Sequence, residues 1–407
     1  MQSLINKITP SKKECDKINK VITNFFNKIK RKLKDANPEL GGSMAKDTWL
    51  AGDHDIDIFV KFPYEKYKSK YIGKLLQERL KGIRYQVMHG SRDYLQIKQD
   101  KYLFELIPVL DIKHHSKHEN ITDVSPLHAQ YVKRNNKNPI HIRILKAFLK
   151  ANNLYGAESY IKGFSGYVAE LLIIHYNGFS NLITAASSWK SRTVIDMAEY
   201  YRNNNEVLSN LNKDKQSNLI LIDPVQPNRN AAAALSEERY IEFINLCKNY
   251  LRHPSKEYFE LKEFNIKELK KKAKNNKLIT FIINPLDGKP DVVGSKILKV
   301  FNYVKDNITN TGFNVIESKW QWKDKALLYY IVRNEKLSKY ITHFGPFGKD
   351  LENVKKFKEK WKKINYDKER VYVKIKRKND TINKFVKTLL KDNYIKQNVK
   401  SIKLKVY

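Results

Sequence analysis

Several residue types are scarce in this chain of 407 residues, and each scarcity excludes a class of protein. The two cysteines, Cys15 and Cys247, lie in apolar helical patterns without metal-ligand spacing, so neither a disulfide framework nor a zinc site is expected. No run approaches the roughly 20 apolar residues that span a bilayer, and the N-terminus has no apolar signal core. We therefore expect a cytoplasmic protein in which both cysteines are small buried hydrophobes.

Acidic residues are also few, because 43 Asp and Glu stand against 78 Lys and Arg, and the net charge is +35. With 41% hydrophobic residues the chain can still build real cores, so it is globular and long enough for two to four domains. The charge excess is uneven, since residues 257–407 contain 37 basic and 17 acidic side chains. We expect a polyanionic partner, bound mainly through its phosphates by this C-terminal part. The pattern there shows no aromatic sheet motif or zinc finger that would read bases.

The segment from Gly42 to Phe59, GSMAKDTWLAGDHDIDIF, places a Gly-Ser turn ahead of an alternating Asp-Ile-Asp-Ile strand. Because side chains alternate faces along a strand, Asp55 and Asp57 point the same way. Two carboxylates at one point suit Mg²⁺, which binds through one or two carboxylates plus substrate phosphates. The turn supplies backbone N–H groups and the Ser43 hydroxyl, and residues 44–48 are expected to form a short helix whose N-terminus favours anions. This pattern is typical of a nucleotidyltransferase.

Hydrophobic periodicity predicts a helix over residues 11–33, a β-rich region with a helix near 71–81, and mostly helical structure from 125 to about 252. Two small α+β units are expected after Pro254, the second inserted in the first. The predicted strands cover residues 55–62, 84–88, 94–98, 103–112, 278–283, 313–322, 326–333 and 371–377, and the later helices cover 291–308, 351–361 and 381–391.

Six segments, in order along the chain, resemble blocks of the archaeal, class I CCA-adding enzymes. The first is GSMAKDTWLAGDHDIDIFVKFP, and the others cover residues 125–132, 145–172, 223–235, 289–293 and 343–357. The resemblance implies an α+β, multidomain fold: a polymerase β-like nucleotidyltransferase head (1–132), a mostly helical neck for nucleotide and base recognition (133–256), and an α+β body and tail that bind tRNA (257–407). It also implies template-independent addition of C, C and A from CTP and ATP to the tRNA 3′ end, with two Mg²⁺ ions.

A two-metal polymerase needs a third carboxylate beside the pair. The resemblance implies Glu105 in this role, three positions before Pro108, where the family has Asp. The departure adds one methylene group, which bears on metal preference and rate. Asp111 lies on the same face of that strand and is the competing candidate, while Asp53 is expected to shape the turn before the first strand.

The resemblance further implies a set of residues that hold the triphosphate: Gly42, Ser43, Lys46, His128, Lys146 and Tyr155. It implies that Arg229 reads the base edge, braced by Asp223 and Asn230. Taken alone, the lysine, histidine and tyrosine of the helical region could equally be ordinary helix residues, and Arg229 a loop cap. Arg92 and Asp93 stand near the family's His-Pro, so the role of that loop is left open, although Tyr94 fits.

Two other functions stay open at this point. A poly(A)- or oligoadenylate-type nucleotidyltransferase would share the Gly-Ser turn and the paired aspartates but not the downstream segments. A tRNA-binding protein with a weakened active site is the other option, and the Glu105 departure is its one supporting feature. The sequence does not decide the oligomeric state, for which the family resemblance suggests a homodimer.

Overall fold

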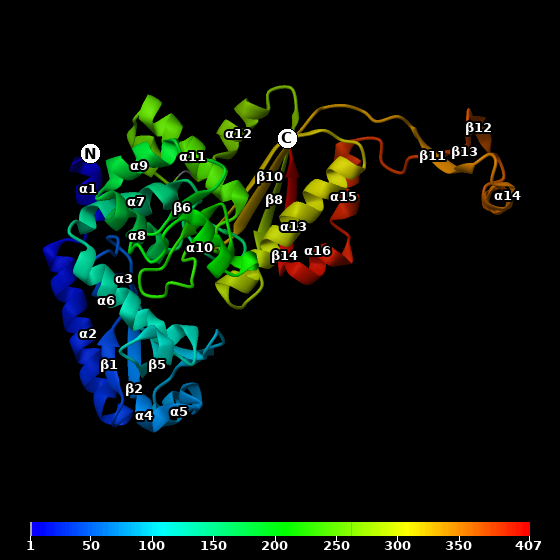
Figure 1. The fold of residues 1–407 in the computed structure, drawn as a ribbon. Coiled ribbons are helices and arrows are strands. Elements are labelled where there is room, and N and C mark those ends of the chain that lie inside the picture. Colours follow the sequence, from blue (N-terminus) through cyan, green and yellow to red (C-terminus); the bar gives the residue numbers. More distant parts are fainter. Residues whose placement is uncertain (1, 262) are drawn as a thin grey trace. The chain divides into compact units, whose positions relative to one another are not determined.

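The computed structural model describes residues 2–261 and 263–407. The chain, drawn as a ribbon in Figure 1, divides into two compact units, Met1–Lys262 and Glu263–Tyr407. Each unit has hydrophobic cores of its own. Within the described residues, every helix is too short or too polar to cross a bilayer.

The first unit begins with a five-stranded sheet in the order β1-β2-β5-β4-β3. The central strands β2 and β5 run parallel, and their neighbours pair antiparallel. The bounds are β1 (Asn37–Leu40), β2 (Asp55–Pro63), β3 (Gln86–Met88), β4 (Tyr94–Gln99) and β5 (Tyr102–Asp111). The four predicted strands of this region are confirmed, whereas the short edge strand β1, which contains a proline, was not expected.

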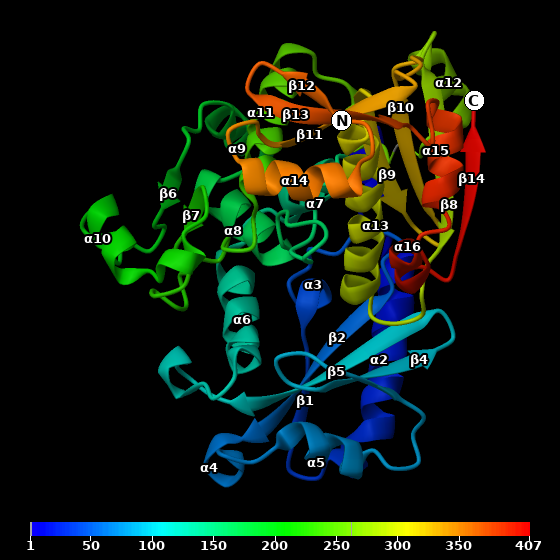
Figure 2. The ribbon, with the colours of Figure 1, turned by 90° about the vertical axis from the view of Figure 1, so that its right-hand side faces the viewer.

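The long helix α2 (Lys12–Leu33) packs along one face of this sheet (Figures 1 and 2). The Ser11 side chain caps its N-terminus by accepting a hydrogen bond from the backbone N–H of Glu14. Phe25 of α2 stacks on Phe104 of β5, with ring centroids 3.9 Å apart. Because Ile56 and Ile58 of β2 belong to the same core, the alternating aspartates of that strand lie on the opposite face of the sheet.

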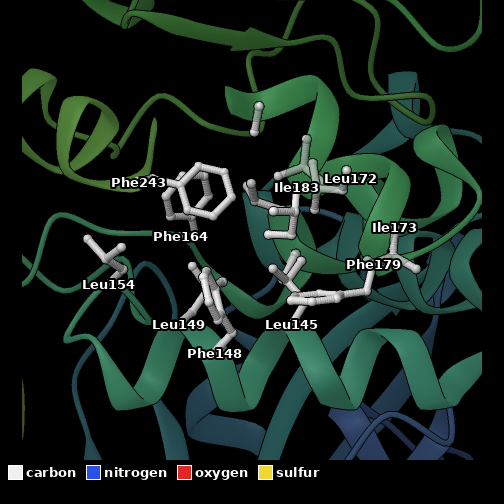
Figure 3. Packing of buried hydrophobic residues seen from close by; sticks show 14 of the residues in the cluster. Leu145, Phe148, Leu149, Leu154, Phe164, Leu172, Ile173, Phe179, Ile183 and Phe243 are labelled. Atoms are coloured by element: carbon white, nitrogen blue, oxygen red, sulfur yellow. The ribbon is translucent and has the colours of Figure 1, made fainter. Parts of the chain in front are cut away.

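The rest of the first unit is mostly helical, as predicted, and packs around a second core that contains Phe148, Phe164 and Phe243 (Figure 3). Two short parallel strands, β6 (Thr193–Ile195) and β7 (Leu219–Leu221), interrupt it. The helices of the unit are α1 (Gln2–Ile8), α3 (Gly42–Ala45), α4 (Tyr64–Tyr67), α5 (Ile72–Arg79), α6 (Ser125–Asn135), α7 (Pro139–Ala151), α8 (Gly166–Tyr176), α9 (Phe179–Ser187), α10 (Asn204–Asn210) and α11 (Glu237–Arg252). Single 3₁₀ turns cover His115–Lys117, Ile121–Val124, Lys213–Lys215 and Lys256–Phe259.

The second unit contains a four-stranded antiparallel sheet in the order β14-β8-β10-β9. Phe281, Val300 and Tyr330 are buried in the core between this sheet and its helices. The strands are β8 (Lys277–Asn284), β9 (Val315–Trp322), β10 (Ala326–Val332) and β14 (Ser401–Val406), and the helices are α12 (Ile266–Ala273), α13 (Pro290–Asn310), α15 (Ile382–Leu389) and α16 (Asn393–Asn398).

A second small sheet is inserted between β10 and α15, as predicted, and has the strand order β11-β13-β12. Its strands are β11 (Tyr340–Phe347), β12 (Asn365–Asp367) and β13 (Arg370–Lys376), and α14 (Leu351–Lys360) follows β11. The first two of these strands were not predicted. Val371 and Val373 of β13 are buried, whereas Tyr340, Phe344 and Phe347 of β11 are exposed.

The cysteines differ in their surroundings, although both are free thiols. Cys247 is buried in the core of the first unit, as expected, and burial raises its pKa. Cys15, in the first turn of α2, is only partly buried, so the expectation of a buried residue was wrong there.

Candidate active site

Three carboxylates lie on the sheet face that α2 leaves free. Asp55 and Asp57 alternate with the buried Ile56 and Ile58 along β2. The parallel register pairs Asp57 directly with Glu105 of β5, so these two side chains leave neighbouring strands on the same face. The structure therefore brings the two aspartates and Glu105 to one place.

The carboxylates raise one another's pKa. Burial, followed by the charge of Glu105, raises the pKa of Asp57 from 3.8 to about 6. Burial also raises the pKa of Glu105 and of Asp55, and each of these feels a second carboxylate nearby. This arrangement disfavours three negative charges at one point, and a bound cation would relieve the repulsion.

Glu105 is held from the neighbouring strand by Gln96, whose Nε2 donates a hydrogen bond of 2.6 Å to Glu105 Oε1. The register explains the contact, because Gln96 of β4 pairs directly with Glu105. Tyr94 lies two residues away, and the charges of Glu105 and Asp57 reinforce the effect of burial in raising its pKa. The longer side chain at position 105 thus has a partner that fixes one of its oxygens.

The donor types fit a hard divalent cation, since all three side chains offer carboxylate oxygens on one face. As the side chains are placed, however, no group of three or more His, Cys, Asp or Glu within the described residues is close enough to hold a metal ion. The residue types therefore fit the ion, while the side chains are not drawn together around it.

Asp111, the competing third carboxylate, lies elsewhere. It is six residues along β5 from Glu105, which is about 20 Å in an extended strand. Its Oδ1 is 2.9 Å from Nζ of Lys61. The register sets it opposite Pro63, at the far end of β2 from the paired aspartates. This placement favours Glu105 over Asp111.

The Gly-Ser turn lies directly against Asp57. Gly42 has a positive φ of 57°, and a Cβ atom built there would be 1.7 Å from Asp57 Oδ2, so this position requires glycine. The backbone N–H of Gly41 donates to the carbonyl of Asp57 over 2.8 Å and fixes the approach. The expected helix over residues 44–48 was out of register, because α3 covers Gly42–Ala45 and Lys46 already ends it.

Lys46 and Lys146 share one buried carboxylate, Glu170 of α8. Lys46 Nζ is 2.6 Å from Oε2, and Lys146 Nζ is 3.0 Å from Oε1. Lys146 also donates to the carbonyl and hydroxyl oxygens of Thr48, at 3.1 and 2.9 Å. All three ammonium hydrogens of Lys146 therefore have internal acceptors, and in this arrangement it can act on a phosphate only through its charge.

Glu170 and Thr48 were not among the residues expected from the sequence. Both are fully buried, and Thr48 Oγ1 donates to Glu170 Oε1 over 2.6 Å. A signal was present, because Glu170 is an acidic residue inside the apolar run VAELLII of α8. A lone carboxylate in such a run must have partners, since an unpaired buried charge is costly.

Tyr155 lies in the loop after α7, close to these groups. Its ring is 5.2 Å from Nζ of Lys150, and a Cβ atom at Gly166 would be 2.9 Å from its hydroxyl. Burial, together with the charge of Glu170, raises its pKa. The side chain is thus a neutral hydroxyl donor at the border of the carboxylate site.

Asp223 connects the residues expected to bind base and triphosphate. Its Oδ2 is 2.9 Å from Nε2 of His128 on α6 and accepts a hydrogen bond from Arg229. Its Oδ1 accepts from the Tyr167 hydroxyl over 3.0 Å. Burial would raise the pKa of Asp223, but His128 and Arg229 outweigh it and lower the pKa to about 2. Asn230 is buried and holds the strand β7 through the backbone N–H of Leu221.

The loop between β3 and β4, which contains Arg92, has a structural role. Arg92 forms an ion pair with the buried Asp123, and its guanidinium also donates to the carbonyl of Pro108 over 3.1 Å. Asp123 additionally accepts from the backbone N–H of Leu110. Arg92 thus fastens this loop to the end of β5. Asp53 lies in a backbone turn closed onto Leu50, as expected, and its charge raises the pKa of Asp55.

Three family models match successive parts of the chain. Residues 22–135 match a nucleotidyltransferase domain, and residues 141–260 match the second domain of tRNA nucleotidyltransferase. Residues 275–404 match the C-terminal domain of CCA-adding enzyme. The carboxylates and the Gly-Ser turn lie in the first of these parts, and Asp223 and Arg229 lie in the second.

Curated proteins are similar over most of the chain. The CCA-adding enzyme of Nanoarchaeum equitans is 34% identical over 367 residues, which cover 87% of this chain and 87% of that protein. The CCA-adding enzyme of Sulfurisphaera tokodaii is 30% identical over 392 residues, covering 95% and 90%. That of Thermococcus gammatolerans is 30% identical over 365 residues, covering 85% and 79%.

Proposed function

The chain belongs to the CCA-adding enzymes, the tRNA nucleotidyltransferases that add C, C and A to tRNA 3′ ends without a template, and we propose that Asp55, Asp57 and Glu105 are its catalytic carboxylates. The pairing of Asp57 with Glu105 across β2 and β5, beside a turn that requires Gly42, is the observation that supports this assignment. The substrates of this class are tRNA, CTP and ATP.

The three carboxylates would hold two Mg²⁺ ions. Such ions would lower the pKa of the attacking 3′-hydroxyl and neutralise charge on the transferred phosphoryl group. The raised pKa of Asp57 supports this proposal, because the site is short of positive charge without a cation. Gln96 would keep the Glu105 side chain in place during the transfer.

The triphosphate would lie at the Gly-Ser turn. Gly42 permits the close approach, and the Ser43 hydroxyl and backbone N–H groups would donate hydrogen bonds to it. Lys46 and Lys146 would contribute positive charge, and Tyr155 and His128 would donate from the helical part of the same unit. All of these residues lie in the first compact unit.

Arg229 would read the Watson–Crick edge of the incoming base. Its guanidinium side chain is one third exposed and is oriented by the fully buried Asp223, which leaves other donors free for a ligand. Cytosine and adenine can present related donor and acceptor pairs to such a fork, whereas guanine and uracil would leave donors unpaired. A fixed arginine thus suits selection of both CTP and ATP.

The second unit would bind tRNA in the cytoplasm. Residues 257–407 contain 37 basic and 17 acidic side chains. In the small sheet, the register of β11 with β13 sets Phe344 opposite Tyr372 and Thr342 opposite Lys374. The Arg370 guanidinium lies 4.1 Å from the Phe347 ring centre. Exposed aromatic rings between cations suit RNA, so base stacking would add to the phosphate contacts expected from the sequence.

A nucleotide-addition assay tests the function as a whole. tRNA transcripts that end before the first C, before the second C and before the A are incubated with one nucleotide at a time. We expect CTP to extend the first two and ATP to extend only the third. Long ATP-dependent tails on any transcript would indicate the poly(A)-type alternative. Tight tRNA binding without extension would indicate the weakened tRNA-binding protein.

A further inference from the structure

Glu170 is a buried carboxylate that belongs neither to the proposed catalytic carboxylates nor to the residues proposed to read the base. It lies on α8 between Ala169 and Leu171, both of which are fully buried, and its own side chain has no exposed surface. Burying a charge in such surroundings is costly unless partners compensate for it. Its partners therefore indicate what it does.

The partners of Glu170 define a small network. Its Oε2 is 2.6 Å from Lys46 Nζ, and its Oε1 accepts from Lys146 at 3.0 Å and from Thr48 Oγ1 at 2.6 Å. We call these four residues the Glu170 network. Burial alone would raise the pKa of Glu170, but the two ammonium groups outweigh it and lower the pKa. Burial lowers the pKa of Lys146, against the effect of Glu170. The network thus sets two basic side chains against one carboxylate.

The network reaches the Gly-Ser turn through two of its members. Lys46 ends α3, the single helical turn that begins at Gly42. The backbone N–H of Thr48 donates to the carbonyl of Ser43 over 2.9 Å. Glu170 thus fixes a cation and a backbone segment that directly follow the turn, from a helix more than 120 residues away in sequence.

Lys46 connects the Glu170 network with the carboxylate site. Its charge lowers the pKa of Asp57, against the effect of burial. Its side chain retains 13% exposure, whereas those of Lys146 and Glu170 have almost none. Of the two cations in the network, Lys46 is therefore the one that a ligand can reach from solvent.

We propose that Glu170 is a positioning residue for the triphosphate: it holds Lys46 and Thr48 so that the Gly-Ser turn and a fixed ammonium group meet the β- and γ-phosphates. This role rests on the proposed function of the turn. Glu170 does not contact the nucleotide, and the unbalanced positive charge of its network is compensated by the phosphates when a nucleotide binds.

The test is binding of CTP and CMP to the full-length Glu170→Gln variant, measured by isothermal calorimetry in the presence of Mg²⁺. Glutamine keeps the shape but cannot neutralise the two ammonium groups. We expect the affinity for CTP to fall about tenfold, or about 1.4 kcal/mol, and that for CMP, which has no β- or γ-phosphate, to change less than about twofold. Equal losses for CTP and CMP, or no loss for CTP, would overturn the proposal. Glu242→Gln is the matched control, because Glu242 forms an exposed ion pair with Arg239.

A second measurement separates positioning from simple destabilisation. Lys46→Ala removes the accessible cation, and we expect the KM for CTP to rise about tenfold with a smaller change in kcat. Adding Glu170→Gln to Lys46→Ala should raise KM by clearly less than Glu170→Gln does alone, because part of the effect of Glu170 acts through Lys46. If the two substitutions raised the KM for CTP independently, so that their effects multiplied, the positioning role of Glu170 would be contradicted. If Glu170→Gln does not fold, Glu170→Asp takes its place in both measurements. It keeps the charge but shortens the side chain by one methylene group, and a loss of affinity for CTP that exceeds the loss for CMP remains the deciding outcome.

The proposed function can fail separately. If the wild-type protein binds CTP no more tightly than CMP, the triphosphate site itself is misplaced. If the wild type prefers CTP and Glu170→Gln retains that preference in full, only the role of Glu170 is wrong.

Discussion

Buried charged side chains occur in the first unit and not, among the described residues, in the second. The first unit buries Asp123, Arg143, Lys146, Glu170 and Asp223. In the second unit the buried polar residue is Thr280, which has no charge. The basic side chains that dominate the second unit lie at its surface.

The difference indicates two uses of charge. A buried charge is costly and is kept where its partners fix its position, so each such residue should have a large and specific effect. An exposed cation contributes little alone, but many of them attract a polyanion over a distance, and salt screens that attraction. We therefore expect substitutions in the first unit to change catalysis or selectivity, and those in the second to change tRNA affinity in a salt-dependent way.

The largest effect should follow from Asp55→Ala or Asp57→Ala. Each change removes a proposed metal ligand, so we expect the turnover with Mg²⁺ to fall at least about a hundredfold. The tRNA affinity should stay close to that of the wild type, because the second unit supplies most of it. Single-turnover extension and filter binding measure the two quantities. A variant that retained normal turnover would show that the metal site lies elsewhere.

The next effect distinguishes Glu105 from Asp111. We expect Glu105→Gln to be as damaging as Asp57→Ala, and Glu105→Asp to keep substantial activity because it restores the carboxylate that the family has there. Asp111→Asn is the control, since its side chain meets Lys61 instead of the catalytic face, and should change turnover less than about threefold. If Asp111→Asn is the inactive variant, the third carboxylate is misassigned.

The sequence predicted the central strands of the first sheet well, because the Asp-Ile alternation from Asp55 to Ile58 directly encodes one buried and one free face. It did not predict β1, whose four residues include Pro38, or β11, whose Gly345 and Pro346 are typical of a loop. The exposed aromatic side chains of β11 were therefore missed as well.

The partners of the site residues were harder to predict than the residues themselves. Nothing in the local sequence joins Lys46 to Glu170, since 124 positions separate them and only the packing of α8 brings them together. The same holds for His128 and Asp223, which come from a helix and a distant loop. Motifs thus identified the chemical groups, and tertiary packing decided which of them are free.

Base selection should depend on Arg229. We expect Arg229→Ala to lower the preference for CTP and ATP over UTP and GTP by about tenfold, because the lost hydrogen bonds go to the base edge. The Mg²⁺-dependent binding of the triphosphate should change much less. Addition of each of the four nucleotides to the three transcript ends measures the ratio. An unchanged ratio would leave Arg229 as a loop cap held by Asp223.

A smaller effect is expected from the double substitution Lys374→Ala and Lys376→Ala in β13. Each cation that contacts a phosphate contributes roughly 0.7–0.9 to the slope of log affinity against log salt, so the slope should fall by about 1.5. At low salt the tRNA affinity should drop several-fold, while CTP binding and kcat stay unchanged. The matched control is Lys7→Ala and Lys12→Ala in the first unit, which should leave the slope as it is. If the double substitution in β13 leaves the salt slope unchanged, tRNA binds to another surface of the second unit.

The smallest effect concerns the stability of the protein without metal. The pKa of Asp57 is about 6 in the folded protein and 3.8 in the reference state, and the pKa values of Asp55 and Glu105 are also raised. The folded state therefore binds more protons than the unfolded state between these values, and its stability should fall as the pH rises from about 4.5 to 6.5. Asp223, with a lowered pKa of about 2, affects stability only at lower pH.

Thermal unfolding in EDTA measures this fall, which we expect to be on the order of 2 kcal/mol for Asp57, or several degrees in Tm. Asp57→Asn cannot ionise at this position, so most of the pH dependence should disappear, and the variant should be more stable than the wild type at pH 7. The Lys374→Ala and Lys376→Ala variant should keep the wild-type dependence, because its charges lie at the surface. A wild-type Tm that rises between pH 4.5 and 6.5 would show that the carboxylates do not repel one another, and the need for cations at this face would lose its electrostatic support.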